Sequence, residues 1–150
     1  MTLPATSSTA NAAAEGKDLA WIAYILHAVG YFSALMWPAL VGLIVNYVKR
    51  GTARGGFVDS HHEWLIRTFW FGLLWYLLSL GTMLWGAWPV VQSVLRAASA
   101  QDTYVIGWDA IFAVIGAATL GGIGFVATWL WLLYRVIRGM INLANSKPVP

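Results

Sequence analysis

The stretch KRGTARGGFVDSHHEWLIR, residues 49–67, decides the fold because it is the most charged part of a sequence that otherwise avoids charge. An uncharged apolar run precedes it from Leu19 to Val48, and a second run follows it from Thr68 to Leu95. A basic, glycine-containing segment between two such runs is typical of a short loop that joins two membrane-spanning helices. The sequence therefore predicts a membrane protein that keeps this segment in water.

The composition of the whole chain indicates the same class. Of its 150 residues, 59% are hydrophobic and 10% are charged, whereas soluble domains carry about 25% charged residues. A soluble protein this apolar would expose large patches and aggregate. The ten Trp and six Tyr favour the headgroup level of a bilayer. The absence of Cys excludes disulfides and thiolate chemistry.

The predicted fold is all-α, an integral membrane bundle of three transmembrane helices in a single domain. We expect a disordered tail at 1–18, a membrane domain at 19–146 with spans at 19–48, 64–88 and 109–134, a loop at 49–62, and a tail at 147–150. Pro89 is expected to end or kink the second span. Apolar residues then recur at helical spacing over 90–98, which predicts a short interfacial helix after that span.

The sequence is compatible with two structures for the first span. Thirty helical residues measure about 45 Å, which exceeds the ~30 Å hydrocarbon core. One possibility is a single long helix kinked at Pro38. The other is a hairpin of two short helices that turns near Trp37 and Pro38. The single helix is expected, because each arm of a hairpin would fall short of the ~20 residues needed to span.

The second span begins with a cluster of polar residues. Ser60 and Glu63 fit a capping box, and Asp59 is an alternative cap one residue earlier. Glu63 and Arg67 are four residues apart in the order that favours a helical ion pair. These side chains form a candidate sequence motif: Asp59, Ser60, His61, Glu63 and Arg67.

The third span carries a stripe of small residues. Ala113, Ala117, Gly121 and Gly124 follow one another in steps of three or four, which places them on one face of a helix. Helices in lipid associate through close backbone approach, so small residues mark a contact face. The sequence therefore predicts that this face packs against another helix. Asp109 is expected to cap the start of the span.

The basic residues predict an orientation. The loop at 49–62 with the start of the second span, together with the C-terminal segment, holds seven of the nine basic residues: Lys49, Arg50, Arg54, Arg67, Arg135, Arg138 and Lys147. The positive-inside rule places these segments in the cytoplasm. Three spans put the N-terminus outside, whereas a hairpin in the first span puts it inside.

Two segments carry a family resemblance. Residues 60–70 (SHHEWLIRTFW) and 134–143 (YRVIRGMINL), with Lys147-Pro148, resemble a group of small proteobacterial membrane proteins. That group is similar to a wider bacterial family of unknown function, itself distantly similar to a component of the chloroplast inner-envelope import channel. The similarity covers roughly Ala20 to Pro148, although the family's usual Asn-Phe-Gln run is replaced here by IRTF at 66–69. The resemblance implies a location in the bacterial inner membrane and supplies no catalytic residues.

Two groups of side chains are candidate sites. His27, His61 and His62 with Glu63 invite a metal or haem site, but His27 lies about 32 Å of helix rise from Val48 in a straight first helix. That places His27 in the leaflet opposite His61, so no metal, haem or other cofactor is expected. The second group can contact an anionic lipid headgroup at the cytoplasmic side: Arg67, Arg135 and Arg138.

No nucleophile, acid–base pair or nucleotide loop is visible in the sequence, so an enzyme is not expected. The hypothesis favoured is a non-enzymatic interaction or assembly partner in the inner membrane. The alternative is a small channel or transporter subunit, and a third hypothesis is a haem-binding membrane subunit. The expected partners are the lipid bilayer, including anionic lipid, and other membrane proteins or a second copy of the chain; nucleic acid is not expected.

Overall fold

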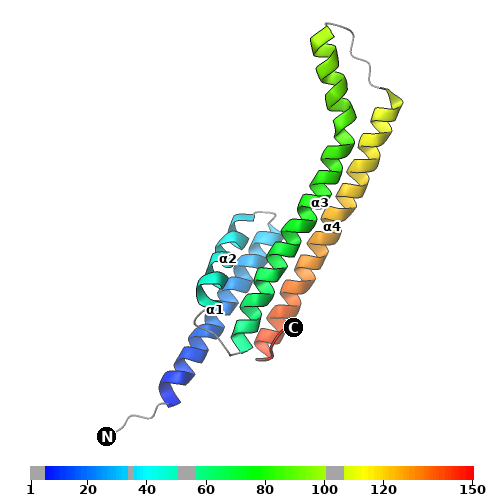
Figure 1. Ribbon diagram of the computed structural model, residues 1–150. Coiled ribbons are helices and arrows are strands. Elements are labelled where there is room, and N and C mark those ends of the chain that lie inside the picture. The colour runs from blue at the N-terminus through cyan, green and yellow to red at the C-terminus, as the bar shows by residue number, and fades with distance from the viewer. Residues whose placement is uncertain (1–5, 34–35, 51–56, 101–106) are drawn as a thin grey trace. The chain divides into compact units, whose positions relative to one another are not determined.

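The computed structural model describes residues 6–33, 36–50, 57–100 and 107–150. They form four helices (Figure 1): α1 (Thr6–Phe32), α2 (Met36–Arg50), α3 (Phe57–Ala100) and α4 (Trp108–Ala144). No strand occurs over these ranges. The all-α prediction is confirmed.

Two of the helices are long and apolar enough to cross a membrane. The candidate spans are Phe57–Ser99 in α3 and Trp108–Ala144 in α4. Only 22% and 17% of their most apolar windows are buried, unlike the mostly buried core helix of a soluble protein. Neither α1 nor α2 qualifies over its described residues. The structure thus contains two candidate spans rather than the three predicted.

Residues 19–48 do not form one kinked helix, so that prediction is wrong. They belong to two separate helices, α1 and α2, which run antiparallel to each other (Figure 1). Pro38 lies in the first turn of α2, where its missing amide has no intrahelical acceptor to lose. The helices approach closely at Gly42, where an added Cβ would lie 2.6 Å from His27 Nδ1. The alternative, a helical hairpin, is confirmed.

The N-terminal segment also differs from its prediction. α1 begins at Thr6, within the predicted disordered tail at 1–18. Ala12, Ala13 and Ala14 lie in this part of the helix, and Ala has the highest intrinsic helix propensity. The segment lacks apolar periodicity, but its local composition favours a helix.

α3 begins earlier and ends later than expected. It starts at Phe57, so Ser60 lies inside the first turn and its hydroxyl donates to the Phe57 carbonyl (2.7 Å). The capping-box prediction is therefore wrong, and Asp59 also lies inside the helix. Of the predicted loop at 49–62, residues 51–56 lie outside the described residues, and the rest is helical.

The prediction of a separate interfacial helix after the second span is likewise wrong. Residues 90–98 continue α3, which runs through Pro89 to Ala100. Proline removes one backbone hydrogen bond and displaces the carbonyl of the preceding turn, which bends a long helix without ending it. The prediction was that Pro89 ends or kinks the helix. Pro89 does not end it, and α3 bends along its length in Figure 1.

α4 extends past residue 134 and ends in a defined cap. The Ser146 amide bonds to the Leu143 carbonyl (3.1 Å) and the Lys147 amide to the Asn142 carbonyl (2.9 Å). Ser146 has a φ of 52°. These are the two bonds and the left-handed residue of a Schellman cap, which turns the chain sharply away from the helix axis.

The described chain divides into two compact units. Unit 1 contains residues 1–71 and 130–150, and unit 2 contains residues 72–129. Unit 1 joins α1 and α2 to the first part of α3 and the last part of α4, around the buried side chains of Leu65, Leu132, Val136 and Leu143. Unit 2 is the antiparallel pair formed by the remaining parts of α3 and α4.

Candidate functional site: a polar core and an arginine cluster

Unit 1 buries polar side chains in a chain that is mostly apolar. Five of them are at most 1% exposed: His27, Asn46, His61, His62 and Thr68. A buried polar group costs free energy unless it is hydrogen-bonded. Each of the five makes at least one hydrogen bond within unit 1. We refer to them, with Tyr24, as the polar core.

His61 connects three segments of unit 1. Its Nε2 lies 3.0 Å from the Lys147 carbonyl, and its Nδ1 lies 2.9 Å from the Tyr24 hydroxyl. A carbonyl only accepts, so Nε2 carries the proton and donates, and Nδ1 accepts from the Tyr24 hydroxyl. The imidazole of α3 thereby holds α1 on one side and the C-terminal segment on the other.

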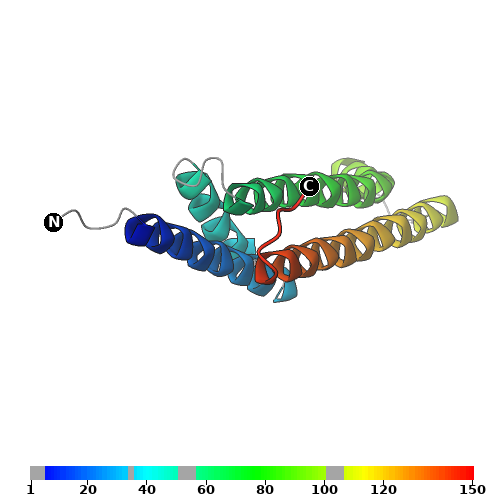
Figure 2. The same cartoon turned by 90° about the horizontal axis from the view of Figure 1, so that it is seen from below.

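The C-terminal segment is anchored at a second point beside His61. The Val149 amide donates to the Ser60 hydroxyl (3.2 Å), and the Val149 side chain is buried. Figure 2 shows this segment leaving α4 and running toward the start of α3. The hydroxyl that was expected to cap α3 instead accepts a hydrogen bond from the end of the chain.

His62 and His27 lie on the side of the polar core that faces α2. The Asn46 amide oxygen accepts from His62 Nδ1 (2.7 Å), and the Ala23 carbonyl accepts from His27 Nδ1 (2.8 Å). His27 Nε2 and Asn46 Nδ2 are buried and have no hydrogen-bond partner among the described residues. His27 thus keeps an unused acceptor and Asn46 an unused donor inside unit 1.

The predicted separation of His27 from His61 is wrong. Tyr24 lies one turn before His27 and hydrogen-bonds His61. The estimate assumed one straight helix, whereas the hairpin of α1 and α2 returns the chain to the same end of the unit. Even so, His61 has both ring nitrogens engaged by protein groups. Over the described ranges, no three His, Cys, Asp or Glu side chains are grouped to hold a metal ion.

Arg135 of α4 is held in a fixed position against α3. Its Nε donates to the Thr68 hydroxyl (2.8 Å), and its guanidinium carbon lies 3.5 Å from the centre of the Trp64 ring. The Trp64 indole in turn donates to the Arg135 carbonyl (3.1 Å), and the Thr68 hydroxyl donates to the Trp64 carbonyl (2.7 Å). A second aromatic ring, that of Trp131, has its centre 5.0 Å from the guanidinium carbon.

The other two predicted arginines lie in the same unit as Arg135. Arg67 and Arg138 are both exposed, and both act electrostatically on Arg135. Arg67 pairs with Glu63 (3.1 Å), which confirms the predicted ion pair, and Arg138 donates to the Tyr134 hydroxyl (2.9 Å). The structure therefore brings together the three arginines that the sequence grouped as a candidate site. We call them, with Trp64 and Thr68, the arginine cluster.

The predicted small-residue face lies in unit 2 and packs on α3. An added Cβ at Gly121 would lie 2.9 Å from the Ser79 carbonyl, and one at Gly124 would lie 3.3 Å from Ser79 Cβ. Ala117 lies against Gly86, where an added Cβ would also come within 3.0 Å of the Ala113 carbonyl. All four residues of the face lie at this contact, where the two backbones approach closely.

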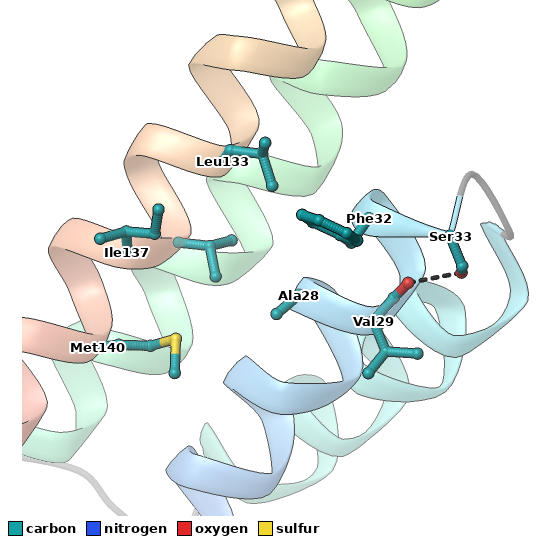
Figure 3. Close-up of a pocket in the computed structure, with 8 residues that line it drawn as sticks. Ala28, Val29, Phe32, Ser33, Leu133, Ile137 and Met140 are labelled. Atoms are coloured by element: carbon teal, nitrogen blue, oxygen red, sulfur yellow. Dashed lines mark hydrogen bonds between the residues drawn. The ribbon is translucent and has the colours of Figure 1, made fainter.

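A shallow apolar groove of about 440 Å³ lies in unit 1 between α1 and α4 (Figure 3). Phe32 and Leu133 line one part of it, and Ile137 and Met140 another. Ser33, at its edge, donates its hydroxyl proton to the Val29 carbonyl (2.6 Å). The groove thus offers apolar surface and no free polar group from Ser33.

No family model, curated protein or solved structure matched the chain. The resemblance to small proteobacterial membrane proteins therefore stays a prediction. Sequence reasoning missed Tyr24, Trp64 and Thr68 as site residues. No local pattern connects Tyr24 with a histidine 37 residues away.

Proposed function

We propose that this chain is an integral protein of the bacterial inner membrane that acts as a non-enzymatic assembly partner of other membrane proteins. The support for the membrane is the pair of candidate spans, whose large apolar side chains are mostly exposed. Such side chains are stable in contact with lipid or with other apolar helices. The proposed spans lie near 64–88, in the middle of α3, and near 109–134, from the start of α4.

One observation carries the assembly role. Ala118, Thr119 and Gly122 form a second patch of small residues on α4, and an added Cβ at Gly122 would meet nothing within 4 Å. Ala118 and Thr119 are exposed. Small residues four apart allow close helix approach in lipid, and a glycine costs helix stability where nothing needs the space. We call this patch the outer small patch and propose that a helix of a partner or of a second copy packs on it.

The proposed topology has both termini and the basic segments in the cytoplasm. The apolar part of α1, Leu19–Phe32, is too short to cross and returns through α2, as in a re-entrant hairpin. Lys17 donates to the Ser146 hydroxyl (3.0 Å), so the N-terminal part of α1 lies beside the C-terminal segment. This topology leaves Arg96 as the one basic residue of nine on the outer side.

The test compares glycines in similar surroundings. Gly122→Leu should abolish self-association or the capture of specific membrane proteins from solubilised membranes, because the bulky side chain keeps a second helix away. Gly81→Leu is the matched control: Gly81 is equally open, but Leu77 and Trp85 lie one turn to either side. Equal association of the wild type and Gly122→Leu, measured by in-membrane crosslinking and affinity capture, would contradict the proposal.

A channel or transporter subunit is the second candidate. It is favoured by the buried His27 Nε2 and Asn46 Nδ2, since unpartnered polar groups in a membrane protein mark pathways for ions or protons. Proton or solute flux into liposomes that contain the purified wild type, lost in Asn46→Leu, would favour this function over assembly. For the haem hypothesis, His61 offers no ligand, because both of its ring nitrogens are hydrogen-bonded to protein groups.

A further inference from the structure

We propose that the arginine cluster binds the phosphate of an anionic phospholipid headgroup, with the guanidinium of Arg135 as the central ligand. The inference rests on the proposed membrane location, which places this end of unit 1 at the inner leaflet. It does not depend on the assembly role, because the cluster lies in unit 1 and the outer small patch lies in unit 2.

Arg135 is positioned before any ligand binds. Trp64 supports the flat face of its guanidinium and Thr68 accepts from its Nε. Trp64 is 5% exposed and Thr68 is fully buried, so both supports are fixed by the surrounding packing. Ordering a free arginine side chain costs rotamer entropy. Here the fold has already ordered it.

Arg135 keeps hydrogen-bond donors for a ligand. Once Nε is bonded to Thr68, the two terminal amino groups of Arg135 have no hydrogen-bond partner among the described residues. Two parallel N–H groups match two oxygens of a phosphate. An anion here would therefore complete the hydrogen bonding of a half-buried cation.

The arginine cluster carries a net positive charge. Arg67 and Arg138 both act electrostatically on Arg135, and among the described residues the carboxylate paired with the cluster is that of Glu63, which bonds Arg67. Three cations and one paired anion leave two positive charges, which repel one another. A phosphodiester anion relieves that repulsion. Arg67, already paired, should contribute less than Arg138.

The surroundings favour a lipid over a free phosphate. Trp70, Tyr134 and Ile137 are each at least half exposed near the cluster in sequence. Exposed aromatic rings beside basic residues are typical of the bilayer interface, where a lipid supplies apolar contact together with the phosphate. Free phosphate would gain only the charge contacts.

The experiment measures lipid binding by native mass spectrometry of the full chain in mild detergent, with phosphatidylglycerol, cardiolipin or phosphatidylcholine added. The wild type should retain the two anionic lipids and release phosphatidylcholine. Arg135→Lys keeps the charge but loses the fork and the Thr68 bond, and should weaken anionic-lipid retention about tenfold. Arg138→Gln, at an exposed position, should weaken it about fivefold.

Arg96→Gln is the matched control, since it removes one exposed arginine from α3 outside unit 1. It should retain lipid like the wild type. Equal retention by Arg135→Lys and the wild type would overturn the proposal, as would equal losses in Arg138→Gln and Arg96→Gln. Displacement of the bound lipid by millimolar inorganic phosphate would overturn the lipid as the source of the phosphate. If the wild type retains no anionic lipid while Gly122-dependent assembly persists, only this inference fails.

Discussion

The two units of this chain hold their helices together by different means. In unit 1, buried polar side chains join four helical segments, with His61 bonded to Tyr24 and to the Lys147 carbonyl. In unit 2, two helices meet through glycine and alanine, and α3 and α4 approach closely at Gly86 and Gly121. One apolar chain can therefore hold the helices of one region together by directed hydrogen bonds and those of another by close backbone contact.

The largest effect is expected where the backbones are closest. Gly121→Leu should destabilise unit 2 by about 3 kcal/mol or more, because the new side chain meets the Ser79 carbonyl and Met83. The measurement is thermal or denaturant unfolding in mild detergent. Leu120→Ile, one residue away and 66% exposed, should change the stability little. Equal stability of the two variants would show that the small face is not a tight contact.

The second effect tests the directed bonds of unit 1. His61→Phe keeps the ring but removes both hydrogen bonds, and should cost about 2 kcal/mol because the Lys147 carbonyl and Tyr24 hydroxyl lose their partner. Tyr24→Phe removes only one of the two bonds and should cost about 1 kcal/mol. The same unfolding measurement applies. A larger loss in Tyr24→Phe than in His61→Phe would contradict the central place of His61.

The smallest effect should be a gain. Ser146 adopts a left-handed conformation at the end of α4, which glycine adopts without strain. Ser146→Gly should therefore stabilise the protein by about 0.5–1 kcal/mol, less the small contribution of the exposed Lys17 bond. Asn145→Gly, inside the last helical turn region, should not stabilise. A loss of stability in Ser146→Gly would mean that the side-chain bond outweighs the backbone strain.

Part of this contrast could be predicted from sequence. The small-residue stripe of α4 and the Glu63–Arg67 pair both rest on helical spacing, which is a local property, and both lie where spacing places them. The polar core could not be predicted in the same way. Its bonds join residues such as Tyr24 and His61 that become neighbours only when α1 and α2 form a hairpin.

Proline was the least informative signal in the sequence. Pro38 lies in the first turn of a new helix, where it disturbs nothing, whereas Pro89 lies inside α3 and does not end it. The position of a proline within a helix decides its effect, and the sequence did not show where α2 began or where α3 ended. The same uncertainty explains the capping-box error, because α3 begins at Phe57, three residues before Ser60.

We propose that the α1–α2 hairpin does not cross the membrane, so that both termini lie on the cytoplasmic side of a chain with two spans. The chain has no Cys, so single cysteines can be introduced at exposed positions without removing others: Ala14, Ser99 and Ala144. In intact cells, a membrane-impermeant thiol reagent should label the cysteine at position 99 and spare those at 14 and 144 until the cells are lysed. Labelling at position 14 together with protection at 144 would contradict the hairpin topology and restore three spans.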